Sequence, residues 1–295
     1  MRVLYATDGR APARYAGRLI ASTFDPTRVQ VDVLTVMPER PKEWVPHDRY
    51  QEQRLDVPPF DEGNELARAA ADSLDAVGFS TTFRSTEGVP AEAILGAAEG
   101  HDAIVLGGSR TSWMGNALLG STSMHVLHHA PCSVAIVHEP PENERVIVGI
   151  DGSDEAEAAV DLCGELLDPT RCEVDVIIAV GHEVPLVVPP YFGGFATNAT
   201  VVERNARERI ESGRRSVQAA SRRLAAKGFD VDEVVLEGAA GPQLLKEVDN
   251  LDAGLLVVGS RGKGALRRTL LGSVSDQVVR HAPATLVVRR RPAHG

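Results

Sequence analysis

Glycines and small hydroxyl residues follow an apolar run near the end of the chain, at a spacing suited to holding a phosphate group. Gly259 and Gly262 are separated by two residues, and nine residues separate Gly262 from the pair Gly272 and Ser273. Glycine lets a backbone approach a ligand closely. The first N–H groups of a helix attract anions, and Ser275 adds a hydroxyl. The spacing therefore predicts a phosphate-binding loop that leads into a helix.

Charged residues beside this loop support the same interpretation. Arg261 and Lys263 lie within the loop and add positive charge, and Asp151 follows an earlier apolar run. A carboxylate there would accept hydrogen bonds from ribose hydroxyls or bind Mg²⁺. Two plainer explanations stay open. The glycines could serve only the close packing of a helix on a strand, and Asp8 and Asp151 could only cap the helices that follow them.

Two other phosphate-binding motifs are excluded by spacing. A P-loop requires G-x-x-x-x-G-K-[ST], but Lys263 is followed by Gly264 and the glycine five positions before Gly262 is missing. The dinucleotide pattern G-x-G-x-x-G is also absent, and the loop follows a fourth strand rather than a first one.

The chain contains an internal duplication. Short segments of the first half recur in the same order in the second, among them Asp8-Gly9 as Asp151-Gly152 and His129-Ala130-Pro131 as His281-Ala282-Pro283. A proline-rich acidic segment separates the halves. We therefore expect a first domain over residues 1–139, a linker over 140–144 and a second domain over 145–295.

Hydrophobic periodicity in the second half alternates between buried strands and amphipathic helices. This order predicts an α/β fold, with a five-stranded parallel sheet covered by helices on both faces, in each half. The strands are expected at Arg145–Ile150, Glu173–Val180, Val231–Leu236, Leu255–Val258 and Thr285–Val288, and the helices at Ser153–Leu167, Arg204–Ala226, Pro242–Asp249 and Ser273–Arg280.

Composition narrows the class of protein. The 295 residues are 43% hydrophobic and carry a net charge of −10, which argues against non-specific binding to DNA or to an anionic membrane. No apolar run reaches the length of a membrane span, and the N-terminal segment lacks a secretory apolar region. The three cysteines form no paired framework. We expect a cytoplasmic protein.

The pattern G-x2-G-x9-G-[ST] after a fourth strand, together with Asp151-Gly152-Ser153 after a first, resembles the ATP-binding branch of the universal stress protein family. The resemblance covers nearly the whole chain as a tandem pair of Rossmann-like domains. It implies ATP as ligand, with Mg²⁺, the loop and its hydroxyls at the phosphates, and the first-strand aspartate and second-strand valine near the nucleoside. The residues implied are Asp151, Val180, Val258, Gly259, Gly262, Gly272, Ser273, Val274 and Ser275.

The first domain departs from this pattern. Aligned on the shared Gly-Ser-Arg, Gly108 takes the place of Gly259 and Thr111 that of Gly262, and the segment up to the next glycine is one residue shorter. A β-branched residue is strained at positive φ, so this loop is interpreted as a second, altered copy of the nucleotide site. Its candidate residues are Asp8, Val36, Gly108, Gly120, Ser121 and Ser123.

Three histidines, His125, His128 and His129, have a spacing that occurs in metal sites. Their counterparts include Gln277 and Arg280, which would not form such a site, so we expect no metal here other than Mg²⁺ with the nucleotide. His129 and its counterpart His281 are expected to contact the last carbonyls of their helices.

The residues beside the loop include no nucleophile with a base and no pair of carboxylates suited to catalysis. We therefore expect no catalytic residues, and a regulatory ATP sensor rather than a dedicated enzyme. A slow ATPase or adenylating enzyme and a nucleotide-free scaffold are the alternatives. The resemblance further implies pairing of the two domains through Ser133–Val137 and Thr285–Val288, a homodimer, and a protein partner that the sequence does not identify.

Overall fold

The computed structural model describes residues 1–38, 60–113, 116–181, 199–262 and 271–289; for residues 60–61, 110–113, 116–118 and 199–202 it describes the backbone only. Lys263 therefore lies outside the described residues. The chain forms two compact units, divided between Pro141 and Glu142. Each unit is an α/β sandwich, as predicted, and is described by itself.

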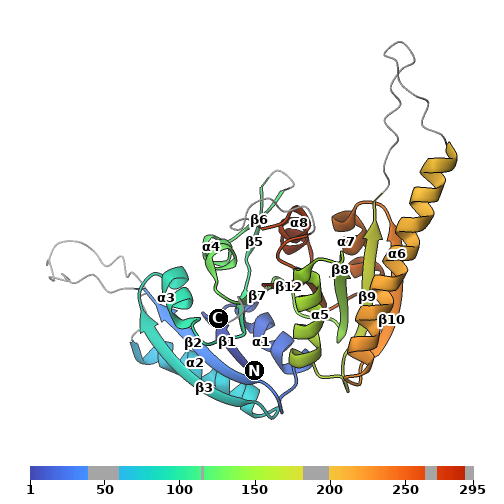
Figure 1. The fold of residues 1–295 in the computed structure, drawn as a ribbon. Helices are drawn as coiled ribbons and strands as arrows, with labels where there is room; N and C mark the ends of the chain where they lie inside the picture. Colours follow the sequence, from blue (N-terminus) through green and yellow to red (C-terminus); the bar gives the residue numbers. More distant parts are fainter. Residues whose placement is uncertain (39–59, 114–115, 182–198, 263–270, 290–295) are drawn as a thin grey trace, which may run out of the picture. The chain divides into compact units, whose positions relative to one another are not determined.

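In the first unit, five parallel strands form a sheet in the order β3-β2-β1-β4-β7, and a separate hairpin, β5–β6, precedes the last helix (Figure 1). The elements are β1 (Arg2–Ala6), α1 (Ala11–Thr23), β2 (Gln30–Met37), α2 (Phe60–Asp75), β3 (Ser80–Glu87), α3 (Pro90–Ala97), β4 (Ala103–Gly107), β5 (Arg110–Trp113), β6 (Asn116–Leu119), α4 (Ser121–His129) and β7 (Ser133–Val137).

The second unit repeats this arrangement, with parallel strands in the order β10-β9-β8-β11-β12. Its elements are β8 (Arg145–Ile150), α5 (Asp154–Leu166), β9 (Glu173–Val180), α6 (Ala199–Ala225), β10 (Asp230–Glu237), α7 (Ala240–Leu251), β11 (Leu255–Gly259), α8 (Ser273–His281) and β12 (Ala284–Val288).

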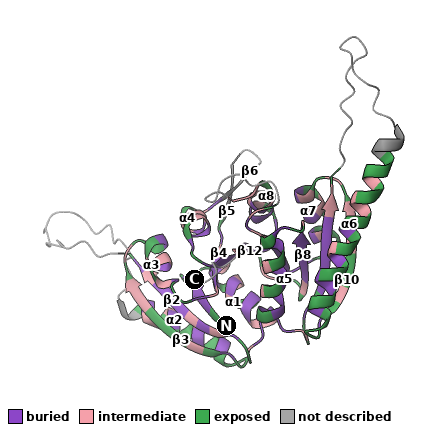
Figure 2. Ribbon diagram, in the orientation of Figure 1, coloured by how far each residue is buried: buried purple, intermediate pink, exposed green. Residues whose placement is uncertain are grey.

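Helices cover both faces of each sheet. In the first unit α1 contacts α2 on one face and α3 contacts α4 on the other, and in the second unit α5–α6 and α7–α8 form the same pairs. Buried residues gather in the strands and on the sheet-facing sides of the helices (Figure 2). The central strands are apolar throughout because both their faces are covered; Val146, Ile147 and Val148 of β8 are fully buried.

The strand order places the candidate site. Strand β8 lies between β9 and β11, so the winding of the chain reverses between β8 and β11. Open α/β sheets bind ligands beyond the carboxyl ends of the strands at this reversal. Asp151 follows β8 directly and Gly259 ends β11, so the fold brings the two predicted parts of the site to the same edge.

The predicted elements of the second half are all present, with ends that agree within two residues except at one helix. Helix α6 begins at Ala199 rather than Arg204. The hairpin β5–β6 in the first unit was not expected from the sequence. Among the helices of the described residues, none is both long and apolar enough to cross a bilayer.

Candidate functional site

Hydrogen bonds close the loop between β11 and α8 at its base. The Ser275 hydroxyl donates to the Gly259 carbonyl over 2.7 Å, and the Gly272 N–H donates to the Ser260 carbonyl over 2.9 Å. The Ser260 N–H in turn donates to Val288 of β12, at 2.8 Å. Residues far apart in the sequence therefore lie side by side at the end of β11 and the start of α8.

One of the loop glycines is required by close packing. A Cβ built on Gly259 would lie 2.9 Å from Cβ and 3.0 Å from the carbonyl carbon of Glu155 in α5. A Cβ on Gly272 would lie 3.4 Å from the Cα of Arg261, which is close to an ordinary van der Waals distance. The packing explanation thus accounts for Gly259, where a side chain would separate the strand from the helix. Val258, one residue earlier, is buried in β11.

The third glycine faces a carboxylate instead of the protein backbone. A Cβ on Gly262 would lie 2.5 Å from Oδ2 of Asp151. The other oxygen of Asp151, Oδ1, accepts hydrogen bonds from the Ser153 N–H (2.9 Å) and hydroxyl (2.6 Å). The backbone of the loop therefore lies directly against Asp151, as the sequence predicts for a shared site.

Asp151 is not the cap of helix α5. The N-cap is Ser153, whose hydroxyl oxygen accepts a hydrogen bond from the Ala156 N–H at 3.2 Å. Asp151 holds this serine in place from two residues earlier. Asp151 therefore belongs to the turn that connects β8 to α5, and the plainer explanation of Asp151 as the helix cap is not supported.

Helix α8 presents its N-terminus to the loop. Its N-cap is Gly272, which offers no side chain to cap the helix, and the Ser275 hydroxyl is directed to Gly259. Ser273 is exposed and Val274 is half-buried. The first N–H groups of a helix have no carbonyl partner within it, so this turn offers donors and the positive end of the helix dipole to an anion.

The charges around the loop are more acidic than the sequence suggested. Arg261 forms an ion pair with Glu155, with 3.0 Å between Nη2 and Oε1. Asp276, in the first turn of α8, forms an ion pair with Arg280 at 2.8 Å, and its hydrogen bonds raise the pKa of that guanidinium. The positive charge of Arg261 is therefore compensated by a carboxylate.

The register of the second strand changes which residue of β9 corresponds to Val36 of β2. The Val180 carbonyl accepts from the Gly238 N–H at 2.9 Å, as the Met37 carbonyl accepts from the Gly88 N–H at 2.9 Å. Val180 is therefore the counterpart of Met37 and not of Val36, and its carbonyl is directed to β10.

Backbone groups of successive residues alternate between the two sides of a strand. In the first unit Leu34 faces β1, since its carbonyl accepts from the Thr7 N–H at 2.9 Å, so Val36 faces the same side. The counterpart of Val36 in the second unit is Ala179, one residue beyond the Ile178 that pairs with the last residue of β8. Ala179 was missed because the two strands were aligned on their valines.

The first unit requires a second correction. The Ser123 hydroxyl donates to the Gly107 carbonyl at 3.1 Å, as Ser275 donates to Gly259. A Cβ on Gly107 would also meet the backbone of α1, 2.4 Å from Ala13 N. The counterpart of Gly259 is therefore Gly107, and the alignment on Gly108 was wrong. The Gly108 carbonyl accepts from buried His138 instead.

With this correction the two loops have the same length. Counting from Gly107, Arg110 rather than Thr111 stands where the second unit has Gly262, and Gly120 stands where it has Gly272. The segment then forms the antiparallel hairpin β5–β6, in which Arg110 pairs with Leu119. The first loop therefore keeps the spacing of the pattern but has an arginine in its sequence where the second unit has Gly262.

The remaining first-unit candidates lie at the corresponding edge. Asp8 follows β1, and its carboxylate accepts from the Arg10 N–H at 3.0 Å. Gly120 is the N-cap of α4 and donates to the Ser109 carbonyl at 3.2 Å, and Ser121 is exposed at the start of that helix.

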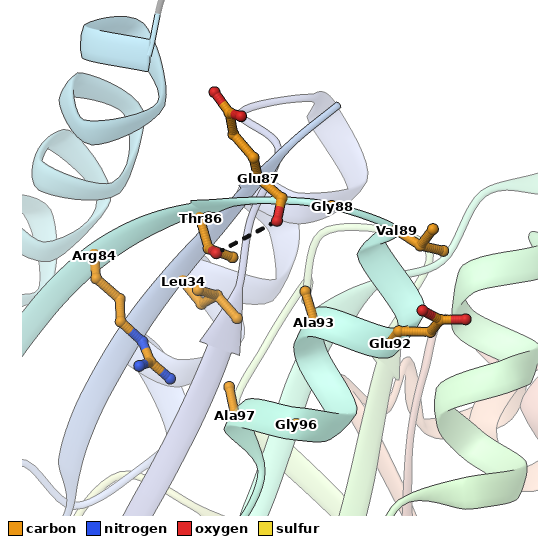
Figure 3. Close-up of a pocket in the computed structure, with 10 residues that line it drawn as sticks. All are labelled: Leu34, Arg84, Thr86, Glu87, Gly88, Val89, Glu92, Ala93, Gly96 and Ala97. Carbon is orange, nitrogen blue, oxygen red and sulfur yellow. Dashed lines mark hydrogen bonds between the residues drawn. The ribbon is translucent and has the colours of Figure 1, made fainter. Parts of the chain in front are cut away.

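A pocket of about 440 Å³ lies elsewhere in the first unit, between α3 and the open face of β2 and β3 (Figure 3). Leu34 and Arg84 line its strand side, and Ala93 and Ala97 line its helix side. None of the predicted site residues lines it. In the second unit Gln243 stands at the position of Ala93, and its side chain donates to the Glu237 carbonyl at 3.0 Å.

The histidines at the helix ends contact backbone carbonyls, as predicted. His129 Nδ1 lies 2.8 Å from the His125 carbonyl, and His281 Nδ1 lies 2.8 Å from the Gln277 carbonyl. The rings of His125 and His129 are stacked. Within the described residues no group of three or more acidic, histidine or cysteine side chains is arranged to hold a metal ion.

Comparison with known proteins gives a consistent result. The universal stress protein family model matches the chain twice, over residues 1–138 and 142–290. A universal stress protein of Mycobacterium tuberculosis is 28% identical over 243 residues, 78% of each chain. One of Mycolicibacterium smegmatis is 30% identical over 215 residues, 68% of this chain and 65% of that one. The crystal structure of a universal stress protein from Archaeoglobus fulgidus superposes with a TM-score of 0.64, at 21% identity and over 99% of this chain and 98% of that one.

Proposed function

The chain belongs to the universal stress protein family, and we propose that its second domain binds ATP and acts as a regulatory nucleotide sensor. The observation that supports this most directly is the contact of Gly262 with Asp151, where a Cβ would lie 2.5 Å from the carboxylate. Packing of a helix on a strand does not require a glycine there, because its neighbour is a polar side chain at the edge of the site.

The phosphates would occupy the N-terminus of α8. The N–H groups of Ser273, Val274 and Ser275 have no carbonyl partner within the helix and would donate to phosphate oxygens, and the exposed Ser273 hydroxyl would add a donor. Arg261 would leave Glu155 and turn toward the triphosphate, so that its positive charge becomes available to the ligand.

The nucleoside would lie between the ends of β8 and β9. The backbone groups of Ala179 face the side on which β8 has already ended, so they are available to the edge of a base. Asp151, whose Oδ1 accepts from Ser153, would accept hydrogen bonds from ribose hydroxyls. Asp8 and Val36 occupy the positions in the first unit that Asp151 and Ala179 occupy in the second.

The residues fit Mg²⁺ only in company with the triphosphate. Mg²⁺ binds through one or two carboxylates together with phosphate oxygens and water, and Asp151 supplies one carboxylate beside the loop. The ion would offset the charge that Asp151, Glu155 and Asp276 place near the phosphates. We do not assign a catalytic role to these residues; the proposal is a binding site whose occupancy changes the interactions of the protein with a partner.

Isothermal titration calorimetry with ATP and Mg²⁺ tests the proposal. We expect about one ATP per chain, a strong loss of binding in Gly262→Val, and unchanged binding in Gly181→Ala, where an added Cβ meets nothing within 4 Å. Phosphate release over many turnovers, lost in Asp151→Ala, would identify an ATPase instead. Absence of binding with the fold intact would identify a nucleotide-free scaffold.

The first domain is proposed to bind nucleotide more weakly or not at all, because Arg110 and the hairpin replace the glycine loop. Pairing of the two domains and a homodimer stay predictions, for which sedimentation measurements are the test. A cytoplasmic location also stays a prediction; the three cysteines are buried and form no disulfide.

A further inference from the structure

Helices α2 and α6 occupy equivalent places in the two units. Each passes over the second strand of its sheet at a glycine: a Cβ on Gly63 would lie 2.6 Å from Cγ of Met37, and one on Gly213 would lie 3.2 Å from Cγ2 of Val180. Since Met37 and Val180 are counterparts, residues of α6 correspond to residues of α2 that lie 150 positions earlier. Sequence changes between the helices can therefore be compared position by position.

The two helices carry opposite charge. Phe60–Asp75 contains five carboxylates and one arginine, whereas Ala199–Ala225 contains seven arginines and three glutamates. The reversal is also local, because exposed Glu65 corresponds to exposed Arg215 and exposed Asp72 corresponds to exposed Arg222. We name these two surfaces the acidic face of α2, containing Glu65 and Asp72, and the basic face of α6, containing Arg215 and Arg222.

The charges on the two faces have the same spacing. The members of each pair lie seven positions apart, which is about two helical turns, or about 10.5 Å along the axis. Within the described part of the chain, neither arginine has an ion pair, and of the two carboxylates only Asp72 has one, with Arg68 at 3.8 Å. Three of the four charges therefore have no ion-pair partner among the described residues, and Asp72 shares only an exposed, long pair with Arg68.

An exposed aromatic side chain lies on β3, the strand that α2 contacts. Phe83 of β3 is 46% exposed and lies between two contacts of β3 with α2: Ser85 to Asn64 at 2.8 Å and Thr81 to Asp75 at 2.7 Å. In the second unit Glu233 stands at its position. A guanidinium packs well on an aromatic ring, and aromatic residues and arginine are enriched among the residues that stabilise interfaces.

We propose that the basic face of α6 docks on the acidic face of α2 in a second copy of the chain, with an arginine against Phe83. The equal spacing of the charges matches one helix to the other, and the chain carries its own complement. The net charge of −10 disfavours nucleic acid as the occupant. Such a contact joins two different surfaces, so it leaves one of each free and propagates into rings or chains.

Sedimentation velocity over a range of protein concentrations tests this contact. We expect reversible association that weakens as salt is raised, because exposed ion pairs are screened. The double variant Arg215→Glu/Arg222→Glu should weaken self-association about tenfold or more through lost pairs and new repulsion. The double variant Glu65→Arg/Asp72→Arg should do the same. A matched control, Arg84→Glu/Lys246→Glu, reverses two exposed charges outside both faces and should associate like the unmodified chain.

Mixing the two double variants makes the test specific. Each variant alone carries two faces of like charge, but the acidic α2 of one complements the basic α6 of the other, so the mixture should associate again. Restored association also shows that both variants are folded. A wild-type chain that stays monomeric at all concentrations, an equal loss in the control, or a mixture that fails to associate would overturn the proposal.

Discussion

The contact between Gly262 and Asp151 makes a sharp prediction for Gly262→Ala. The added Cβ would lie 2.5 Å from Oδ2, closer than a carbon and an oxygen approach without a bond, so the carboxylate must turn away. Turning it displaces Oδ1, which accepts from the Ser153 N–H and hydroxyl at 2.9 and 2.6 Å. The substitution is therefore expected to disturb the turn between β8 and α5 although Gly262 itself is exposed.

The magnitude follows from these hydrogen bonds. One hydrogen bond to a charged group contributes about 1.5–3 kcal/mol, and the lower chain entropy of alanine in the unfolded state offsets about 0.4–1 kcal/mol. We expect the free energy of unfolding to fall by about 1–2 kcal/mol. If ATP depends on the same position of Asp151, its dissociation constant should rise about tenfold, since 1.4 kcal/mol corresponds to that factor.

A double-mutant cycle measured by urea unfolding tests the reasoning without ATP. In an Asp151→Ala background the added methyl group meets no carboxylate, so Gly262→Ala should have no destabilising effect there, and the coupling between the two positions should be about 1–2 kcal/mol. An equal loss of stability in both backgrounds would refute the contact, and so would a Gly262→Ala chain as stable as the unmodified one that binds ATP equally well.

Three further substitutions test other parts of the structure. Asp32 accepts hydrogen bonds from Thr82, Arg2 and His101; burial alone would raise its pKa, but these bonds outweigh burial and lower it. Ionised Asp32 therefore stabilises the fold above its unfolded-state pKa, and this contribution is lost as pH falls through the lower folded-state pKa. The stability difference between the unmodified chain and Asp32→Asn, followed by urea unfolding, should shrink below about pH 4; a difference independent of pH would contradict this. Gly96→Ala, in helix α3 with nothing within 4 Å of the new Cβ, should raise the free energy of unfolding by about 0.5–1 kcal/mol, and a lower melting temperature would argue against the helix. Ser275→Ala removes a hydrogen bond to the Gly259 carbonyl at a buried position, and should lower the free energy of unfolding by about 1–3 kcal/mol. An unchanged free energy of unfolding would show that this bond does not hold the loop.

The fold could be predicted from the sequence because its elements are locally encoded. Strands such as β8 are continuous apolar runs. Helix α5 shows a clear apolar stripe of period 3.6, and the helix ends where that stripe ends. Helix α6 was predicted too short by five residues because its first turns, Ala199 to Glu203, carry no comparable stripe. The hairpin β5–β6 was missed because the four-residue strands are too short to show alternation.

The errors in the site came from alignment and from long-range contacts. Two adjacent glycines, Gly107 and Gly108, were candidates for one position, and the shared Gly-Ser-Arg favoured Gly108. The bond from Ser123 and the close approach of Gly107 to α1 identify Gly107 instead. In the sequence, Val180 was aligned with Val36 because both are valines, so the true counterpart, Ala179, was not identified. The ion pair of Arg261 with Glu155 joins elements about a hundred residues apart, and no local pattern reports it.

The central claim is that the second domain holds one ATP at the loop that ends on α8. Native mass spectrometry of the chain mixed with ATP and Mg²⁺ counts bound nucleotides directly, and Ser273→Pro, which removes one donor N–H where proline is tolerated in a helix, weakens only this site. We predict one bound ATP per chain, strongly reduced in Ser273→Pro and unchanged in the first-domain counterpart Ser121→Pro. Binding lost in Ser121→Pro but kept in Ser273→Pro, or no binding at all, would contradict the account.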